Sequence, residues 1–410
     1  MTELKDAASP DIQVDFDIHS PDAVEKVYDT YADLRSTCPV AHSTRYGGHF
    51  VATRYDDIHD IVRNPSVFSS SQINVPDSIG QDGEMIPIQI DPPDHTVYRR
   101  LITPLFSPKR MAALEPQIRD LVVRLLDDMA GRDRVDFIEA FARELPSQVF
   151  LALMGWDIAD APRLIEWVDT MVLGVPGASE EESLAAREAA GMEVYAYFAE
   201  MIDDREESPR SGEDEDEDIT QILMDGTFDG RPLTQFEILN ILLLMMIGGL
   251  HTVQGQLAHS VIYLAEHPEA RQEILDDPDV IPSAVEEMLR YESAICPARK
   301  VTQDVVVGDV QLRQGDVILV PFGAANRDPE KFPEPDSVDL RRDPNPHLAF
   351  GAGNHRCVGS HLARLELRIA FEELHRRFPH YRLDPSDPPV RHLSQVKGVH
   401  RLPLILGESA

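Results

Sequence analysis

The sequence is poor in cysteine, in tryptophan and in basic residues, and these shortages exclude several classes of protein. Only 3 cysteines and 2 tryptophans occur among 410 residues. Cys38, Cys296 and Cys357 are too few for a disulfide framework, which favours a reducing compartment. Lys and Arg number 38 against 72 Asp and Glu, so the formal net charge is −34. Because nucleic-acid binding needs a basic surface that displaces counterions, this balance argues against a nucleic-acid partner.

Long apolar runs and a targeting segment are also missing. The longest apolar stretch, Ile238–Leu250, is interrupted by Asn240. It is too short to span a bilayer. Residues 1–20 have no apolar segment behind a basic start, so they show no secretory signal, and we expect them to be extended or flexible. These features predict a cytoplasmic protein with no membrane partner.

The remaining composition, 42% apolar and 27% charged, is typical of a globular protein. Apolar residues at helical spacing dominate the chain, and strand-like pieces are short. The pattern therefore predicts a mainly α fold with small β-sheets, in one domain over residues 1–410. The predicted helices are 112–129, a long helix that begins after a capping box at Thr234 and Glu237, 258–266, 269–275, 283–291 and 359–378. The predicted strands are 49–53, 305–307, 310–312, 317–321 and 402–406.

One acidic run, Glu213–Asp218, concentrates the negative charge. A block of six like charges repels itself, so we interpret it as a solvated loop or a mobile tip.

A glycine-rich segment around Cys357 carries the main chemical signal. Residues 350–359 read FGAGNHRCVG and directly precede an amphipathic helix. The glycines allow a tight loop that approaches a flat ligand, and the positive end of the helix dipole favours thiolate over thiol. Such a thiolate could be a nucleophile, a redox group or a metal ligand, although a buried structural cysteine is the ordinary alternative. Zinc is disfavoured, because no second Cys or His lies at ligand spacing.

The pattern Phe350, Gly353, Cys357, Gly359 resembles the haem-binding signature of the cytochrome P450 family. Glu287 and Arg290 match the Glu-x-x-Arg pair of that family, and the segment 326–336 resembles its meander region. Ser337 stands where many members have the Arg or His that completes the Glu-x-x-Arg network, which leaves the third partner open. The similarity runs from about residue 50 to the C-terminus and implies the cytochrome P450 fold.

By this resemblance, Cys357 is the axial thiolate ligand of haem b, which is iron protoporphyrin IX. The resemblance further implies that O2 is a co-substrate and that the haem propionates need cationic partners. Taken singly, each candidate cation could equally be surface charge. The residues implied to bind the cofactor are His95, Arg99, Arg299, Phe350, Gly351, His355, Cys357 and Gly359.

The segment Gly248–Thr252 resembles the oxygen-activating part of the long distal helix in the same family. We expect Thr252 to act on bound dioxygen and its protons, although a threonine inside a helix can instead bond to its own backbone. His251 replaces the carboxylate of most bacterial members. An imidazole can relay protons, so we expect His251 to take part in proton delivery, with a purely structural histidine as the alternative.

The resemblance also predicts a substrate pocket and an electron partner. The expected substrate is a small or medium hydrophobic molecule of the terpenoid or aromatic kind, which is hydroxylated by a monomeric enzyme. The pocket residues are Ile88, Val172, Leu244, Ile247, Gly248, Ile295 and Val396. Electrons are expected from a ferredoxin and an NAD(P)H-dependent ferredoxin reductase, steered by a basic patch of Arg100, Lys109, Arg110, Arg356 and Arg364. The alternatives are a peroxygenase or isomerase that uses no ferredoxin, and a haem-binding sensor without turnover.

Overall fold

The structure is a computed structural model, and it describes residues 13–20, 23–77, 83–175, 178–207 and 218–407. The chain folds into two units, which we treat separately. Unit 1 comprises Met1–Asp77, Asp279–Cys357 and Val390–Val399, and unit 2 comprises Ser78–Pro278, Val358–Pro389 and His400–Ala410. The prediction of a single domain over 1–410 stays a prediction.

A mixed six-stranded sheet in the order β1-β2-β3-β11-β8-β4 forms the centre of unit 1. The pairs β1–β2 and β3–β11 are parallel, and the other three pairs are antiparallel. The core beside the sheet contains residues such as Val51, Ile58 and Ile318, all with 0% exposure. The strands are β1 (Gln13–Val14), β2 (Val40–Ser43), β3 (His49–Ala52), β4 (Phe68–Ser69), β8 (Ala298–Val301) and β11 (Val317–Leu319).

Short helices and two hairpin-like strand pairs complete unit 1. The helices are α1 (Val27–Thr37), α2 (Tyr55–Arg63), α11 (Ile281–Tyr291) and α12 (Phe322–Ala325), with 3-10 turns at Arg45–Gly47, Pro278–Val280 and Gly353–His355. The additional strand pairs are β9 (Val305–Val307) with β10 (Val310–Leu312), and β13 (Val390–His392) with β14 (Gly398–Arg401), whose last two residues belong to unit 2.

Unit 2 is mostly helical. Its helices are α3 (Asp94–Ile102), α4 (Pro108–Met129), α5 (Glu144–Met154), α6 (Ala161–Leu173), α7 (Glu180–Glu207), α8 (Ile219–Met224), α9 (Gln235–Glu266), α10 (Pro268–Asp276) and α13 (Ser360–Arg377). Helical turns at Thr103–Phe106, Ile138–Ala142 and Ile158–Asp160 connect some of them. Its strands are β5 (Arg134–Asp136), β6 (Thr227–Phe228), β7 (Arg231–Pro232), β12 (Arg382–Leu383) and β15 (Pro403–Ile405).

Helix α9 is the core helix of unit 2. The predicted capping box begins it: Glu237 N donates to Thr234 Oγ1 at 3.2 Å, and Thr234 N donates to Glu237 Oε2 at 2.7 Å. Among the described helices, α9 is the one long and apolar enough to cross a membrane by length and composition. Its most apolar stretch is 56% buried inside the fold, and a core helix of a globular protein has the same character.

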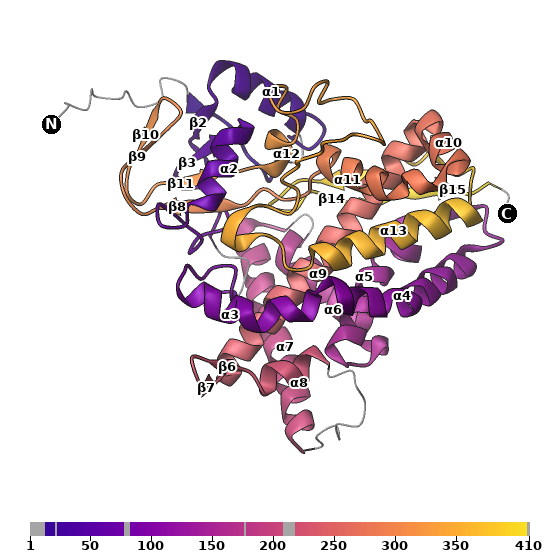
Figure 1. The fold of residues 1–410 in the computed structure, drawn as a ribbon, viewed down its shortest axis with the longest axis horizontal. Coiled ribbons are helices and arrows are strands. Elements are labelled where there is room, and N and C mark those ends of the chain that lie inside the picture. The colour runs from indigo at the N-terminus through magenta and orange to yellow at the C-terminus, as the bar shows by residue number, and fades with distance from the viewer. Residues whose placement is uncertain (1–12, 21–22, 78–82, 176–177, 208–217, 408–410) are drawn as a thin grey trace. The chain divides into compact units, whose positions relative to one another are not determined.

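Helices α4 and α13 run side by side in unit 2 (Figure 1). An ion-pair network links them, because Arg119 of α4 contacts Glu372 at 2.6 Å and Glu373 at 2.7 Å, and Arg368 of α13 contacts Glu115 at 2.7 Å. The second half of α13, the helix that follows the Cys357 segment in sequence, is thereby linked to α4.

The predicted mainly α fold with small sheets is confirmed, with few changes of boundary. Residues 258–266 form the last part of α9 rather than a helix of their own. The acidic run lies outside the described residues except for Asp218, and there the interpretation as a solvated loop is wrong. Asp218 is buried, accepts the N–H of Gln221 at the start of α8, and pairs with Arg205 at 2.8 Å.

A fully buried ion pair in unit 1 fixes the long segment that follows α12. Glu287 and Arg290 are both 0% exposed, and their closest N···O distance is 2.8 Å. Arg290 also donates to the backbone oxygens of Asn326, Pro335 and Ser337.

Arg342 is the third partner that Ser337 leaves open. Arg342 Nε lies 3.1 Å from both carboxylate oxygens of Glu287, whereas Ser337 contributes only its backbone oxygen to this network. The cation that completes the Glu287–Arg290 network thus lies five positions after Ser337 in the chain.

We expect Arg342→Ala to destabilise the protein by about 2 kcal/mol, because a buried carboxylate loses a charged hydrogen-bond donor. Arg341→Ala is the control, since Arg341 is exposed beside it. Chemical denaturation of the two variants measures the difference. Equal unfolding free energies would contradict the assignment of Arg342.

Glu366 in α13 is a second buried carboxyl, and its Oε2 has no hydrogen-bond partner among the described residues. Burial raises the pKa of Glu366 to about 8. The unfolded chain has a carboxyl pKa of about 4.3. Unfolding therefore releases a proton from Glu366 at any pH between these two values, and stability falls as the pH rises.

Glu366→Gln removes this pH dependence because an amide does not ionise. Between about pH 5 and about pH 7, the stability of the variant relative to the natural chain should increase by about 1 kcal/mol per pH unit. Denaturation at several pH values measures this, with Glu269→Gln, an exposed position of α10, as the control. A difference that is constant with pH would show that Glu366 is already ionised in the folded chain.

Candidate functional site

The Cys357 segment of unit 1 is a closed loop with the thiol at its end. Cys357 N donates to Phe350 O at 2.8 Å, and Gly351 N donates to Leu348 O at 2.8 Å. Gly351 and Gly353 have φ values of 65° and 69°, which favour glycine. A Cβ on Gly353 would lie 3.0 Å from Val62 O of α2, so the loop also packs too closely for a side chain there.

The buried Arg290 holds this loop through Asn326. Arg290 donates to Asn326 O at 2.9 Å, and the side-chain oxygen of Asn326 accepts the N–H of Leu348 at 2.7 Å. Leu348 O in turn accepts the N–H of Gly351. A chain of hydrogen bonds therefore runs from the Glu287–Arg290 pair to the loop, which explains why these sequence motifs occur together.

The three thiols have different surroundings, and Cys357 is the exposed one. Cys296 is buried, and burial raises its pKa to about 12. Cys38 is half-buried, and burial raises its pKa as well. Cysteine is ordinarily among the most buried residues, so exposure at the start of α13 separates Cys357 from a structural thiol.

The predicted propionate partners lie in both units. In unit 1, Arg299 is 5% exposed and donates to Ala298 O at 2.7 Å, and His355 lies two residues before Cys357. In unit 2, His95 and Arg99 are one turn apart on α3. Burial, and then the charge of Arg99, lower the pKa of His95 to about 4, so this ring is neutral near neutral pH.

One stripe of α9 is exposed in the middle of an otherwise buried helix. Leu244, Gly248 and Thr252 repeat every four residues, and each is exposed or half-exposed, whereas the flanking Met246, Leu250 and Val253 are buried. A Cβ on Gly248 would meet no atom within 4 Å. This face of α9 therefore has open space above its predicted reactive segment.

Thr252 and His251 point to different surroundings. Thr252 Oγ1 donates to Gly248 O at 2.8 Å, which is the backbone bond that the alternative interpretation anticipates. His251 is 4% exposed and its Nε2 lies 2.8 Å from Asp169 Oδ1 of α6. The two lone pairs of the Thr252 oxygen remain available as acceptors.

The predicted pocket residues form two groups. In unit 1, Ile295 and Val396 are brought together by an isolated antiparallel bridge. In unit 2, Leu244, Ile247 and Gly248 lie on α9, and Val172 is buried on α6, which packs against α9. Ile88 is half-buried in a turn before α3.

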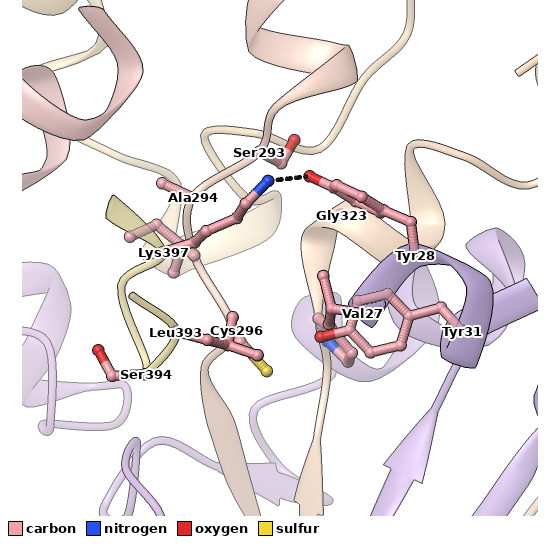
Figure 2. A pocket seen from close by; sticks show the side chains of 12 residues that line it. Val27, Tyr28, Tyr31, Ser293, Ala294, Cys296, Gly323, Leu393, Ser394 and Lys397 are labelled. Carbon is pink, nitrogen blue, oxygen red and sulfur yellow. Dashed lines mark hydrogen bonds between the residues drawn. The ribbon is translucent and has the colours of Figure 1, made fainter. Parts of the chain in front are cut away.

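A small cavity adjoins Ile295 in unit 1, with room for about one water molecule. Figure 2 shows Lys397 at its wall, with the ammonium group 3.3 Å from the hydroxyl of Tyr28. Lys397 also contacts Glu292, so the residue after Val396 is tied to the end of α11. The cavity is too small for an organic substrate.

The predicted basic patch is exposed to different degrees. Arg100 of α3 and Lys109 of α4 are exposed, and Arg110 of α4 and Arg364 of α13 are half-exposed. These four belong to unit 2, where α4 and α13 lie side by side. Arg356 is exposed in the loop of unit 1.

The residues present fit a haem. The chain offers one exposed thiol as a soft iron ligand, and two arginines and two histidines at the positions predicted for the propionates. Among the residues that the structure describes, no group of three or more His, Cys, Asp or Glu could hold a metal ion in another way.

Three residues of interest were missed in the sequence. Arg342 and Asp169 acquire their roles through partners far away in the chain, which helical spacing does not reveal. Glu366 carried a usable signal, because it lies between Leu365 and Leu367 on a predicted amphipathic helix.

Comparison with known proteins agrees with the geometry. The profile of the family "Cytochrome P450" matches residues 47–403. The mycinamicin IV hydroxylase/epoxidase of Micromonospora griseorubida is 33% identical over 373 residues, which cover 88% of this chain and 90% of that protein. The biotin biosynthesis cytochrome P450 of Bacillus subtilis is 32% identical over 395 residues, which cover 94% and 97%.

Solved structures show the same fold. Cytochrome P450 CYP101C1 superposes with a TM-score of 0.86 at 28% identity, over 98% of this chain and 99% of that chain. CYP109E1 from Bacillus megaterium, solved in complex with testosterone, gives a TM-score of 0.84 at 28% identity, over 94% and 99%. The sequence motifs, the fold and the family profile agree, and the chain therefore belongs to the cytochrome P450 family of haem-thiolate monooxygenases.

Proposed function

We propose that this enzyme hydroxylates a small or medium hydrophobic substrate with O2 and two electrons, using haem b with Cys357 as the iron ligand. The observation that carries the proposal is the exposed Cys357 thiol at the end of a loop that is fixed by hydrogen bonds. Phe350, Gly351 and Gly359 shape this loop, and His95, Arg99, Arg299 and His355 would pair with the propionates. When bound, a thiolate-ligated haem supplies O2 activation, because the thiolate donates electron density that favours O–O cleavage.

The exposed stripe of α9 supports the roles proposed for Thr252 and Gly248. Gly248 leaves space for small molecules, and the Thr252 hydroxyl, which already donates to Gly248 O, would accept a hydrogen bond and order a water molecule there. His251 would supply protons to this segment. Its pairing with Asp169 is compatible with either a relay or a structural role.

The substrate proposal rests on the apolar character of the predicted pocket. The bridge between Ile295 and Val396 and the α9 face around Leu244 present aliphatic side chains. Mycinamicin IV and testosterone, which appear in the names of two relatives, are consistent with a hydrophobic compound, and a terpenoid or aromatic molecule is our proposal for this chain.

The electron source in this proposal is a ferredoxin with an NAD(P)H-dependent reductase, acting on a monomeric cytoplasmic enzyme. The basic residues of α3, α4 and α13 support it, since they stand out in a chain with a net charge of −34. A local positive surface attracts an acidic partner and sets the association rate.

Cys357→Ala tests the iron ligand, with Cys38→Ala as the matched control. We expect the Cys357 variant alone to lose the red-shifted band of thiolate-ligated haem in the reduced, carbon monoxide-bound spectrum. A band that persists in the Cys357 variant would reject this ligand.

Charge reversal tests the docking surface. Lys109→Glu and Arg364→Glu should each slow reduction by a plant-type [2Fe–2S] ferredoxin by about tenfold at low salt, and the effect should shrink at high salt. Arg124→Glu is the control, because Arg124 is exposed on the same helix α4 roughly 20 Å further along. Stopped-flow reduction rates equal to those of the Arg124 variant would exclude the patch.

A further inference from the structure

A buried histidine and a half-buried aspartate from two helices form a pair in unit 2. His251 of α9 is 4% exposed, Asp169 of α6 is 31% exposed, and His251 Nε2 lies 2.8 Å from Asp169 Oδ1. Helix α9 itself has no carboxylate between Glu237 and Glu266. The carboxylate beside this segment is thus supplied by a neighbouring helix.

Two further charged or titratable groups face Asp169. Arg143, between the Ile138–Ala142 turn and α5, lies 3.5 Å from Asp169 Oδ2 and pairs with Glu139 at 2.9 Å. His400 of β14 is also close enough to interact electrostatically. Burial raises the pKa of Asp169, but His251, Arg143 and His400 outweigh it and hold this pKa below its usual range. Asp169 is therefore ionised at neutral pH.

An ionised carboxylate beside one ring nitrogen selects the tautomer of a histidine. The carboxylate lies 2.8 Å from Nε2 and so favours the tautomer with the proton on Nε2, which leaves the lone pair on Nδ1. A carboxylate in this place also stabilises the ring when it becomes a cation, as it does in hydrolase triads. In this tautomer Nδ1 is the ring atom that can accept a hydrogen bond.

We propose that Asp169 is a positioning residue that turns His251 into the proton carrier for the Thr252 segment. Hydroxylation of R–H by O2 consumes two electrons and two protons and yields R–OH and water. In each transfer, Nδ1 takes a proton from water and gives it to the water or hydroxyl at Thr252, which releases one of its own protons at the same time. The ring returns to its neutral form, and Asp169 stays ionised throughout. This inference rests on the proposed function, since it requires that Thr252 lies where protons are consumed.

Asp169→Asn tests the proposal because the amide keeps the shape and removes the charge. The matched control is Glu193→Gln: the Glu193 carboxylate accepts the N–H of Trp167 at 2.8 Å, so it also ties α6 to a neighbour. Limonene, ethylbenzene and testosterone serve as substrate probes, and the one with the largest spin-state shift is used. We expect product formed per NAD(P)H to fall at least about tenfold in Asp169→Asn. The solvent deuterium isotope effect should rise, KM should be unchanged, and Asp169→Glu should restore much of the loss.

The tautomer gives a readout that does not depend on turnover. In the reduced, carbon monoxide-bound protein labelled with ¹⁵N-histidine, the His251 ring should show a protonated Nε2. Asp169→Asn should lose that preference, whereas Glu193→Gln should keep it. The ¹⁵N signals that are missing from the His251→Ala spectrum are those of the His251 ring.

Two results would overturn the proposal. One is an Asp169→Asn protein whose coupling and isotope effect equal those of the Glu193 control. The other is a variant in which only KM or thermal stability changes, which would make the pair a structural link between α6 and α9. If the natural enzyme forms no product from any probe, the proposed function is at fault, and the tautomer measurement still decides the role of Asp169.

Discussion

The buried pair of Glu287 and Arg290 is the constraint on which the functional part of unit 1 depends. Two opposite charges with no exposure are tolerable only when every donor and acceptor is satisfied. The Glu287 carboxylate accepts further hydrogen bonds from Arg342, Asn345 and the backbone N–H of Asp339. Arg290 donates to three backbone oxygens. The segment after α12 has no regular secondary structure over most of its length, and these bonds replace the helix or sheet bonds that would otherwise fix it.

In unit 2, the constraint is that polar groups must lie on or beside an apolar core helix. Burial of an unpaired charge within α9 would be costly. The helix therefore carries small and uncharged groups at Gly248, Gly249 and Thr252, and the one titratable residue there, His251, meets its carboxylate from α6. Placing the charge on a neighbouring helix keeps α9 apolar enough to pack and leaves its open face free for ligands.

Patterns that act locally were readable in the sequence, and partners distant in the chain were not. The loop glycines, the capping box of Thr234 and Glu237, and helices such as α4 and α9 depend on neighbours within a few residues, and the structure has them where the sequence predicts them. The sequence analysis did not predict the 28-residue helix α7. Strands of two residues such as β1 and β4 show no alternation and were missed. Asp218 was misinterpreted because charge density alone says nothing of Arg205, which buries it.

The pairing of Thr252 shows a further limit of sequence reasoning. A hydroxyl inside a helix has the choice between its own backbone and the space beside it, and only the structure shows the bond to Gly248 O. The role of the Thr252 hydroxyl depends on the groups beside it, and residue spacing in the sequence does not reveal these neighbours.

The discontinuity of unit 1 has a consequence for biosynthesis. Strand β3, near the N-terminus, pairs with β11, and the last piece of the unit ends at Val399. A ribosome that adds roughly 5–20 residues per second completes α9 and most of unit 2 before it delivers β11. The nascent β2–β3 hairpin thus waits on the order of 10 s or longer with an unpaired edge, a period in which aggregation competes with folding. Productive folding of this enzyme therefore depends on how long that edge stays unpaired during translation.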